Sequence, residues 1–322
     1  MRSLVTGAGG MVGSHMVEQL CWRGDEVIGV WHKNKKNVEQ VDAPVKFVQC
    51  DLRYGQGIDQ LIMDNLPGEI YHLAAQSYPT VSWVSPSETI DVNLCGQIAV
   101  FEAIKKARKY VDSNYDPMVV IACSSAEYGE TLNKLEGDEV YVKETAQLLP
   151  LHPYGVSKVG QDLLGFQYFM NDHIRCIRAR IFNSTGTRKV NDVTSDFTKR
   201  AVLAERSGNH TLRVGNLDTH RAIMDQRDLV HALMLLAQKG EAGEVYNISS
   251  EHVYQMRDIV TMIEKAVAFE FKIEVDPELL RPTDEKIIVG DVSRLKAATG
   301  WKQEIPMEQT IEDMLEYWRK VL

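Results

Sequence analysis

The chain has 322 residues, and 36 lysines and arginines against 45 aspartates and glutamates give it a formal net charge of −9. With 44% hydrophobic and 25% charged residues it has an ordinary globular composition, which excludes wholesale disorder, and its length suggests roughly two lobes. A net acidic chain also argues against a broad nucleic-acid or anionic membrane surface, so any bound anion needs locally concentrated positive charge.

The start of the chain and its cysteines predict a compartment. The first strand begins at Ser3, which leaves no room for a signal peptide, and no apolar run reaches the roughly 18 residues of a membrane span. The cysteines are odd in number and widely spaced, and neither they nor the histidines show metal-ligand spacing. We therefore expect a reduced, cytoplasmic protein with no metal, no membrane association and no nucleic-acid partner.

Short apolar segments alternate with helix-length segments through the first two-thirds of the chain. The expected strands are Ser3–Thr6, Glu26–Trp31, Val45–Gln49, Glu69–Leu73, Met118–Ala122 and Ile174–Arg180. The expected helices between them are Val12–Arg23, Ile58–Asn65, Ser87–Arg108 and Pro153–Asn171. Buried-type strands that alternate with helices predict an α/β fold with a doubly wound parallel sheet, the Rossmann arrangement.

After about Asn183 the elements become shorter, with helices expected at Asp196–Arg206, Asp228–Gln238 and Met307–Lys320. We expect residues 1–183, with parts of 210–250, to form a dinucleotide-binding domain. Residues 184–322 should form mainly a smaller C-terminal α/β substrate lobe, with a crevice between the two. The polar segment Thr131–Leu149 is expected to be an inserted loop.

A glycine-rich turn follows the first strand directly and opens a helix, with glycines at positions 7, 10 and 13. Glycine permits a tight turn, a close approach to a pyrophosphate and close packing of helix on strand. The helix N-terminus adds unpaired N–H groups and the positive end of the helix dipole. In this strand–turn–helix context the pattern predicts a dinucleotide site.

The end of the second strand indicates which dinucleotide. A carboxylate there would bind the ribose 2′-hydroxyl of NAD, whereas basic residues accept the 2′-phosphate of NADP. The strand ends in the basic run His32–Lys36 with no acid nearby, and Lys33 and Lys35 would attract a phosphate, which favours NADP. A solvated basic loop is the alternative interpretation. Asp51, after the third strand, is expected beside the adenine amine.

Tyr154 and Lys158 form a YxxxK pattern on an expected helix, where positions four apart share a face. A nearby ammonium should lower the pKa of the phenol toward the working pH. Such a tyrosine can exchange a proton with a substrate oxygen while a hydride moves to or from nicotinamide. The preceding strand ends near Ser124 and Ser125, which places hydroxyls at the sheet edge where ligands bind.

With these residues the chain resembles the extended short-chain dehydrogenase/reductase family over essentially its whole length. Further matching signals are His72–Gln76, Asn93 and Ile181–Asn183. The resemblance implies a serine–tyrosine–lysine triad acting on a sugar nucleotide. In that triad Ser124 polarises the substrate oxygen, Tyr154 is the acid or base, and Lys158 tunes the phenol and holds the nicotinamide ribose. The cofactor contacts expected on this basis are Gly7, Gly10, Met11, Val12, Gly13, His32, Lys33, Asp51, Leu52, Leu73, Ala74, Ala75, Tyr154 and Lys158.

Two C-terminal segments, Leu212–Asp218 with Arg221 and Leu280–Asp284, are similar to the nucleotide-recognising segments of the family's GDP-mannose-modifying branch. In that branch they enclose guanine and hold the diphosphate, which an arginine fork matches bidentately. Each arginine could instead cap a helix or bridge the lobes. The expected substrate contacts are Ser77, Ser125, Asn183, Arg188, Lys199, Val214, Asn216, Arg221, Arg281 and Asp284.

Two activities share these signatures in the branch: 4,6-dehydration of GDP-mannose, and reduction of the resulting 4-keto-6-deoxy sugar at C4. The dehydratases carry a glutamate two residues beyond the catalytic threonine, whereas this chain has Ser124 and Ala126 at those positions. A methyl group cannot move protons, and Glu127 would face the other way along a continuing strand. The segment Thr194–Phe197 also resembles the reductases. We therefore expect an NADPH-dependent reductase of a GDP-4-keto-6-deoxymannose-type sugar.

Alternatives stay open because Arg188 and the pair Gln76–Ser77 resemble the dehydratases. The second candidate is therefore a GDP-mannose 4,6-dehydratase. A C4 dehydrogenase or epimerase on a related GDP-sugar, heptoses included, and an inactive NADP-binding sensor follow it. The expected helices Ser87–Arg108 and Pro153–Asn171 carry long apolar stripes, which form a four-helix dimer interface in the relatives, so we expect a homodimer.

Overall fold

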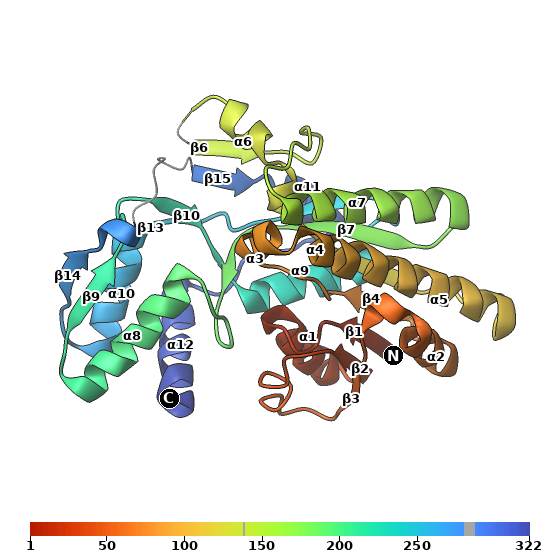
Figure 1. The fold of residues 1–322 in the computed structure, drawn as a ribbon, viewed down its shortest axis with the longest axis horizontal. Helices are drawn as coiled ribbons and strands as arrows, with labels where there is room; N and C mark the ends of the chain where they lie inside the picture. Colours follow the sequence, from red (N-terminus) through yellow and green to blue (C-terminus); the bar gives the residue numbers. More distant parts are fainter. Residues whose placement is uncertain (138, 280–286) are drawn as a thin grey trace.

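The computed structural model describes residues 1–137, 139–279 and 287–322. Seven parallel strands form the central sheet in the order β12-β7-β5-β4-β1-β2-β3 (Figure 1). Their bounds are β1 (Arg2–Thr6), β2 (Glu26–Trp31), β3 (Val45–Gln49), β4 (Glu69–His72), β5 (Met118–Ser124), β7 (Cys176–Ile181) and β12 (Val245–Ile248). The expected doubly wound parallel sheet is confirmed, and the strand order reverses between β1 and β4, where a ligand crevice is expected.

Successive strand residues point into two separate cores, because side chains alternate across a sheet. Val5 and Tyr71 pack on one face against α1 (Met11–Trp22), α9 (Gln226–Lys239) and α11 (Ser293–Thr299). Their neighbours Leu4 and Ile70 pack on the other face, against α2 (Gln56–Asn65), α5 (Gly96–Tyr110) and α7 (Pro153–Asp172). Burial on both faces explains why these strands read as short apolar runs.

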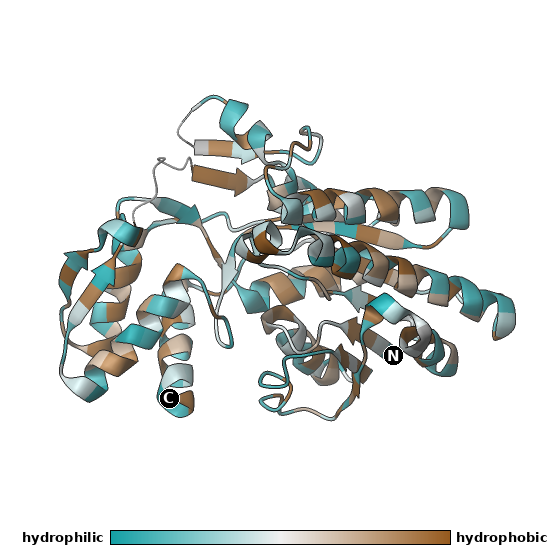
Figure 2. Ribbon diagram, in the orientation of Figure 1, coloured by the Kyte–Doolittle hydropathy of each residue, from teal (hydrophilic) through white to brown (hydrophobic). Residues whose placement is uncertain are grey.

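Hydrophilic and hydrophobic residues alternate along α5 and α7, as Figure 2 shows, which is typical of helices that bury one face. The expected helix 87–108 is divided. It consists of α4 (Pro86–Ile90), a π-helical turn (Asp91–Cys95) and α5, and a further short helix, α3 (Pro79–Val84), precedes it. None of the helices in the described part of the chain is long and apolar enough to cross a membrane.

A smaller lobe lies beside the sheet, at the left of Figure 1. Its core is formed by α8 (Val193–Ser207), α10 (Met256–Val267) and α12 (Met307–Val321), which pack on the parallel pair β9 (Thr211–Val214) and β14 (Lys272–Val275). Two short pairs join this region to the sheet: β8 (Ser184–Thr185) with β11 (Met224–Asp225), and β10 (His220–Ala222) with β13 (Val253–Gln255). Of the segment 210–250, which was expected to contribute to the dinucleotide-binding domain, β9 lies in the small lobe. In contrast, β12 is a strand of the large sheet and α9 packs on that sheet.

The expectation that Thr131–Leu149 is only a loop was wrong. This segment contains most of α6 (Glu130–Lys134) and the strand β6 (Glu139–Val142), which pairs in parallel with β15 (Ile287–Gly290). Val140 and Val142 are buried while Tyr141 between them is exposed, an alternation too short to stand out from the polar surroundings. Because its partner strand lies far away in sequence, local patterning could not reveal the pairing.

Candidate active site

A cleft of about 1210 Å³ lies between the sheet and the small lobe. One wall is formed by residues at the carboxyl ends of the strands, including Gly7, Leu73 and Ser124. The opposite wall comes from the small lobe, with Phe197 of α8 and Val214 of β9. Ligands of open α/β sheets bind at this edge, which makes the cleft the candidate site.

The glycine turn forms the floor of one end of the cleft. Gly7 has a φ of 75°, and a Cβ on it would lie 2.7 Å from the Ala74 amide nitrogen, so only glycine fits there. A Cβ on Gly13 would lie 2.1 Å from the Gly7 carbonyl oxygen. Gly10 caps α1, and Met11 and Val12 of its first turn line the cleft with the turn glycines. The positive N-terminal end of α1 therefore opens into the cleft, where it could hold a pyrophosphate.

The basic run after β2 is arranged differently from the expectation. His32 lines the cleft, but Lys33 does not, and its Nζ lies 3.6 Å from a carboxylate oxygen of Glu88. Lys35 pairs with Glu39 at 2.9 Å. Lys36 lines the cleft instead, and within the described part of the chain it forms no ion pair. The structure therefore moves the candidate phosphate-binding cation from Lys33 to Lys36, which sequence reasoning did not single out.

Three other expected cofactor residues do not line the cleft. The Asp51 carboxylate accepts hydrogen bonds from Arg53, which lower the pKa of Asp51, and it lies 3.4 Å from His32 Nε2. Leu52 is buried in the core, and the Ala74 amide donates to Thr6 Oγ1 at 3.2 Å. The remaining pair after β4 is placed as expected, since Leu73 and Ala75 both line the cleft.

The three proposed catalytic side chains meet in the cleft. Ser124 is the last residue of β5, and Tyr154 and Lys158 lie in the first turns of α7. The His152 ring caps this helix by accepting a hydrogen bond from the Gly155 amide at 2.9 Å. This cap fixes the start of α7 and therefore the position of Tyr154 in its first turn. Lys158 Nζ lies 5.7 Å from the centroid of the Tyr154 ring, and Ser124 forms a hydrogen bond with the phenol. The helical spacing predicted from YxxxK therefore produces one shared site.

The pKa of the phenol does not follow the expectation. Burial raises the pKa of Tyr154 to about 12, although the hydrogen bond with Ser124 opposes the rise. Burial also lowers the pKa of Lys158 to about 8, against the attraction of Cys123 and Glu127. The expected lowering of the phenol pKa is therefore not found, because burial has the largest effect on the phenol and outweighs the hydrogen bond with Ser124. At neutral pH the phenol carries its proton, so it can donate one.

The turn after β5 separates the cleft from a buried carboxylate. Glu127 accepts the Ser124 amide at 2.8 Å, and the Ser124 hydroxyl oxygen accepts the Ala126 amide at 3.2 Å. These two bonds hold the strand end in a capped turn. Ala126 lines the cleft, whereas Glu127 is fully buried and does not line it. The cause differs from the expected one, because the strand ends at Ser124 and a 3-10 turn follows it.

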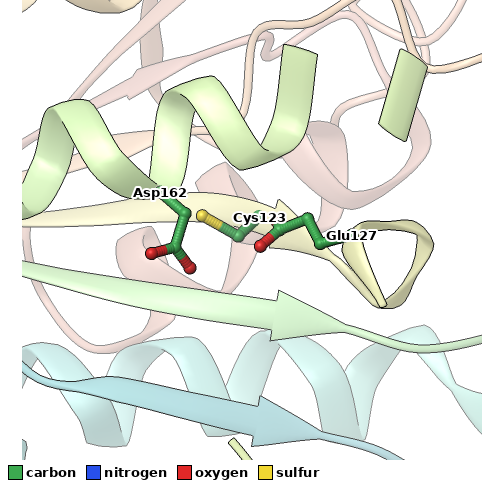
Figure 3. A group of neighbouring side chains, drawn as sticks. All are labelled: Cys123, Glu127 and Asp162. Atoms are coloured by element: carbon green, nitrogen blue, oxygen red, sulfur yellow. The ribbon is translucent and has the colours of Figure 1, made fainter. Parts of the chain in front are cut away.

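Glu127 belongs to a buried group with Cys123 and Asp162, and Figure 3 shows the three side chains converging from β5, the following turn and α7. Their ligand atoms are close enough to hold a metal ion. However, Arg180 Nε lies 2.9 Å from Asp162 and 3.2 Å from Glu127, and Arg178 bonds Asp162 at 2.7 Å. Burial and Asp162 raise the pKa of Glu127, and Arg180 lowers it. The group is therefore best explained as a partner for the arginines that joins β7 to α7.

Asn93 connects two parts of the site through the π-helical turn. Its side chain accepts the Gln76 amide at 2.7 Å and donates to Ser157 Oγ at 2.8 Å. Gln76 precedes Ser77, which lines the cleft, and Ser157 precedes Lys158. The π-helical turn therefore holds the loop after β4 against the catalytic helix, a role typical of such turns near functional sites.

Most of the expected substrate residues line the cleft: Ser77, Ser125, Asn183, Arg188, Val214, Asn216 and Arg221. Lys199 does not, because its Nζ lies over the Trp318 ring, 5.5 Å from the centroid. Arg281 and Asp284 lie outside the described residues. Arg213 belongs to the expected nucleotide-recognising segment but was not named as a contact; it lines the cleft between the buried Leu212 and Val214, as strand alternation could have indicated.

Arg188 lines the cleft, but its guanidinium is already engaged. It forms two hydrogen bonds with the Glu18 carboxylate, at 2.9 and 2.7 Å, and a third with the Gln40 carbonyl oxygen at 2.9 Å. Arg188 has a φ of 65°, so this segment is held in a left-handed conformation against α1. Arg188 therefore bridges the segment before α8 to α1, and its expected contact with a diphosphate stays a prediction.

Known proteins are similar to this chain over most of its length. A sequence profile of the family described as GDP-mannose 4,6 dehydratase matches residues 4–314. The chain belongs to this family. GDP-6-deoxy-D-mannose reductase from Pseudomonas aeruginosa is 26% identical over 264 residues, which cover 79% of this chain and 81% of that protein. GDP-mannose 4,6-dehydratase from Vibrio cholerae is 24% identical, over 97% of this chain and 92% of that protein.

The fold agrees with the same family. The structure of RMD from Pseudomonas aeruginosa, complexed with NADPH, superimposes with a TM-score of 0.82 and 25% identity, covering all of this chain and 99% of that one. The expected resemblance to the GDP-mannose-modifying branch of the extended short-chain dehydrogenases/reductases is therefore confirmed. Reductases and dehydratases both occur among the relatives, so the residues of the site distinguish the two reactions.

Proposed function

We propose that this protein is an NADPH-dependent reductase that reduces the C4 keto group of a GDP-4-keto-6-deoxymannose-type sugar. The observation that carries the proposal is the floor of the cleft beside Ser124. There Ala126 presents a methyl group, while Glu127 is turned away and held by the Ser124 amide and Arg180. A hydride and proton transfer needs only the triad, whereas 4,6-elimination needs a further proton-moving group at C5 and C6.

The residues fit NADPH. A Cβ at Gly7 or Gly13 would collide with the protein backbone, so the glycine turn packs tightly, and the N-terminus of α1 that follows it borders the cleft. Lys36 supplies a cation at the side where a 2′-phosphate would lie, and the basic run 32–36 contains no carboxylate. The relative whose structure superimposes at a TM-score of 0.82 is complexed with NADPH, which supports the same choice here.

The chain's own residues orient the keto group and supply the proton that its oxygen receives. When bound, the nicotinamide supplies the hydride that reaches C4. Ser124 orients the keto oxygen by hydrogen bonding, and the protonated Tyr154 phenol gives its proton to that oxygen as negative charge develops there. The resulting phenolate is stabilised by the Lys158 ammonium, whose Nζ lies 5.7 Å from the ring centroid, until water returns the proton.

The substrate nucleotide is proposed to lie against the small lobe. Val214 and Asn216 of the segment after β9 line the cleft there, together with Arg213 and Arg221. Guanidinium groups match phosphate oxygens bidentately, and they supply the local positive charge that an acidic chain needs to hold a diphosphate. The resemblance of this segment to the nucleotide-recognising segments of the branch supports guanine as the base.

The direct test supplies the purified protein with GDP-mannose and NADP⁺, or with GDP-4-keto-6-deoxymannose and NADPH, and identifies the products. We expect consumption of NADPH and a 4-hydroxy product only from the keto sugar. Conversion of GDP-mannose to the 4-keto-6-deoxy sugar without net use of cofactor would show a dehydratase, the second candidate, which the Vibrio cholerae relative favours. Interconversion of C4 epimers, oxidation at C4, or NADP binding without turnover would indicate the remaining alternatives.

Ala126→Glu tests the stated reason for the reductase proposal. The new carboxyl would stand in the cleft beside Ser124, where it could move a proton. We expect reduction of the keto sugar to fall and a trace of elimination from GDP-mannose to appear, with Ala126→Gln as the uncharged control of the same size. If both variants behave alike, a carboxyl group at position 126 does not decide between reduction and elimination, and the stated reason for the proposal is wrong.

We further propose a cytoplasmic homodimer. All five cysteines are free, as in a reducing compartment. Leu163, Phe166 and Met170 form an apolar stripe on the outer face of α7, and they are 57%, 46% and 53% exposed. Such a stripe on a helix that borders the catalytic site is typical of a face that a second copy covers.

A further inference from the structure

Gln161 lies one helical turn beyond Lys158 on α7 and is fully buried. Its amide oxygen accepts a hydrogen bond from Lys158 Nζ at 2.7 Å. The same ammonium donates to the Ala122 carbonyl oxygen, also at 2.7 Å. An ammonium has three donors, so these two bonds leave one for the cleft that Lys158 lines.

The orientation of the Gln161 amide is set by this contact. An ammonium only donates, so the oxygen of the amide has to face Lys158. That choice leaves Gln161 Nε2 buried without a hydrogen-bond partner among the described residues. A buried donor without a hydrogen-bond partner is unfavourable. Native structures retain such a donor where another interaction of the same side chain determines its orientation. The requirement here is an acceptor for the ammonium.

Other groups near the ammonium do not supply that acceptor. The titratable groups around it come from β4, β5, the turn after β5, α7 and β7, and they are His72, Cys123, Glu127, Tyr154, Asp162 and Arg180. Burial lowers the pKa of His72 to about 3 and raises that of Cys123, so both are neutral at pH 7. Glu127 is bonded to the Ser124 amide and lies beside Arg180. Gln161 is therefore the side chain that directly holds the ammonium.

We propose that Gln161 is a positioning residue, which holds the Lys158 ammonium beside Tyr154 and favours its protonated form. The proposal rests on the proposed function, because it takes Tyr154 as the proton donor whose phenolate Lys158 stabilises. Gln161 itself does not line the cleft and acts only through the lysine.

Two substitutions should move the pH dependence in opposite directions. Gln161→Met keeps the length of the side chain but removes the acceptor, so the ammonium should lose its proton more easily. We expect the fall of kcat on the alkaline side to move about one pH unit lower. Gln161→Glu places a carboxylate against the ammonium, and the same fall should move about one unit higher. Shifts in the same direction, or none in either variant, would overturn the proposal.

Stability separates positioning from a merely structural role. Gln161→Met removes the unpartnered Nε2 donor together with the acceptor, and the two effects oppose each other, so its Tm should stay close to that of the parent protein while kcat at about pH 8.5 falls roughly tenfold. A structural role predicts a lower Tm and the same loss of kcat at every pH. Gln97→Met is the matched control: Gln97 is equally buried, also has an unpartnered amide atom and donates to the Gln161 carbonyl at 2.8 Å, but has no contact with Lys158. It should leave the pH profile unchanged.

A second readout needs no substrate, so it distinguishes failure of this proposal from failure of the proposed function. Protein labelled with ¹³C at lysine Cε reports the pKa of each lysine by NMR, and Lys158→Arg identifies the signal of Lys158. We expect the pKa of Lys158 to fall in Gln161→Met and to rise in Gln161→Glu. If these shifts occur but the keto sugar is not reduced, Gln161 still holds the Lys158 ammonium, and only the proposed function is wrong. An unchanged Lys158 signal refutes it whatever the substrate.

Discussion

Lys36 is the basic residue of the β2 loop that reaches the cleft, whereas Lys33 faces Glu88 outside it. If Lys36 binds the 2′-phosphate of NADPH, Lys36→Ala should raise the KM for NADPH about 10- to 100-fold, the effect of losing one charged hydrogen bond. The KM for NADH should change little, because NADH lacks that phosphate. Steady-state kinetics with both cofactors measures the difference.

Lys33→Ala is the control for this prediction, since it removes an equal charge from the same loop. We expect it to leave both KM values within about twofold of the parent, apart from weak long-range screening effects. If Lys33→Ala raises the KM for NADPH and Lys36→Ala does not, the loop adopts another arrangement around the cofactor and the assignment to Lys36 is wrong.

At the level of single residues, the sequence could identify those whose role follows from spacing. Tyr154 and Lys158 share a helix face, and Ser124 ends a buried strand, so their meeting was predictable. The choice between Lys33 and Lys36 was not, because it depends on how an irregular loop turns. The pKa of Tyr154 was not predictable either, since the cost of burial depends on groups that the fold brings together.

The contact between α1 and the segment before α8 joins two elements that are far apart in sequence. Burial alone would raise the pKa of Glu18, but hydrogen bonds from His15 and Arg188 lower it to about 2. Because the folded pKa lies below the unfolded value of 4.5, this carboxylate stabilises the fold above pH 4.5, and the contribution is lost as the pH falls toward 2. The left-handed φ of Arg188 is held by the same contact.

Arg188→Ala should therefore act on stability. Removing one partner of a buried ion pair leaves Glu18 uncompensated, and we expect the free energy of unfolding at pH 7 to fall by about 3 kcal/mol. The loss of stability between pH 4.5 and 2 should become smaller, because a raised Glu18 pKa lies closer to the unfolded value. Urea denaturation across this pH range measures both effects. If the unfolding free energy is unchanged and the KM for the GDP-sugar is much higher, Arg188 binds the diphosphate and the bridging role is wrong.

Elements were predictable where their own residues decide them. Six of the seven central strands, together with α1, α7 and α12, were located from the sequence to within a few residues, whereas the edge strand β12 was not expected. Pairing of β6 with β15 depends on a partner far along the chain, and the segment between β5 and α7 therefore looked like a loop. The break of the helix at Asp91–Cys95 depends on contacts of Asn93 with Gln76 and Ser157, which belong to other elements.

For the whole molecule, the site is complete only because both lobes contribute to it. The strand ends supply Ser124 and the glycine turn, α7 supplies Tyr154 and Lys158, and the small lobe supplies Arg213 and Asn216. This arrangement explains why a chain with a net charge of −9 can be expected to bind two anionic nucleotides, since the positive groups and the α1 terminus face one cleft. The outer face of α7 carries the opposite character, an apolar stripe directed away from the cleft.

That stripe predicts the oligomeric state. Replacing Leu163 and Phe166 together by glutamate puts two charges into the proposed contact, so the double variant should be a monomer at micromolar concentration while the parent is a dimer. Light scattering after gel filtration measures the mass of each. Trp22→Glu is the control, because Trp22 on α1 is 69% exposed and lies outside the stripe, so it should stay dimeric. A parent protein of monomeric mass would show that the α7 stripe has no second copy on it, and a dimer that survives the double substitution would place the interface elsewhere.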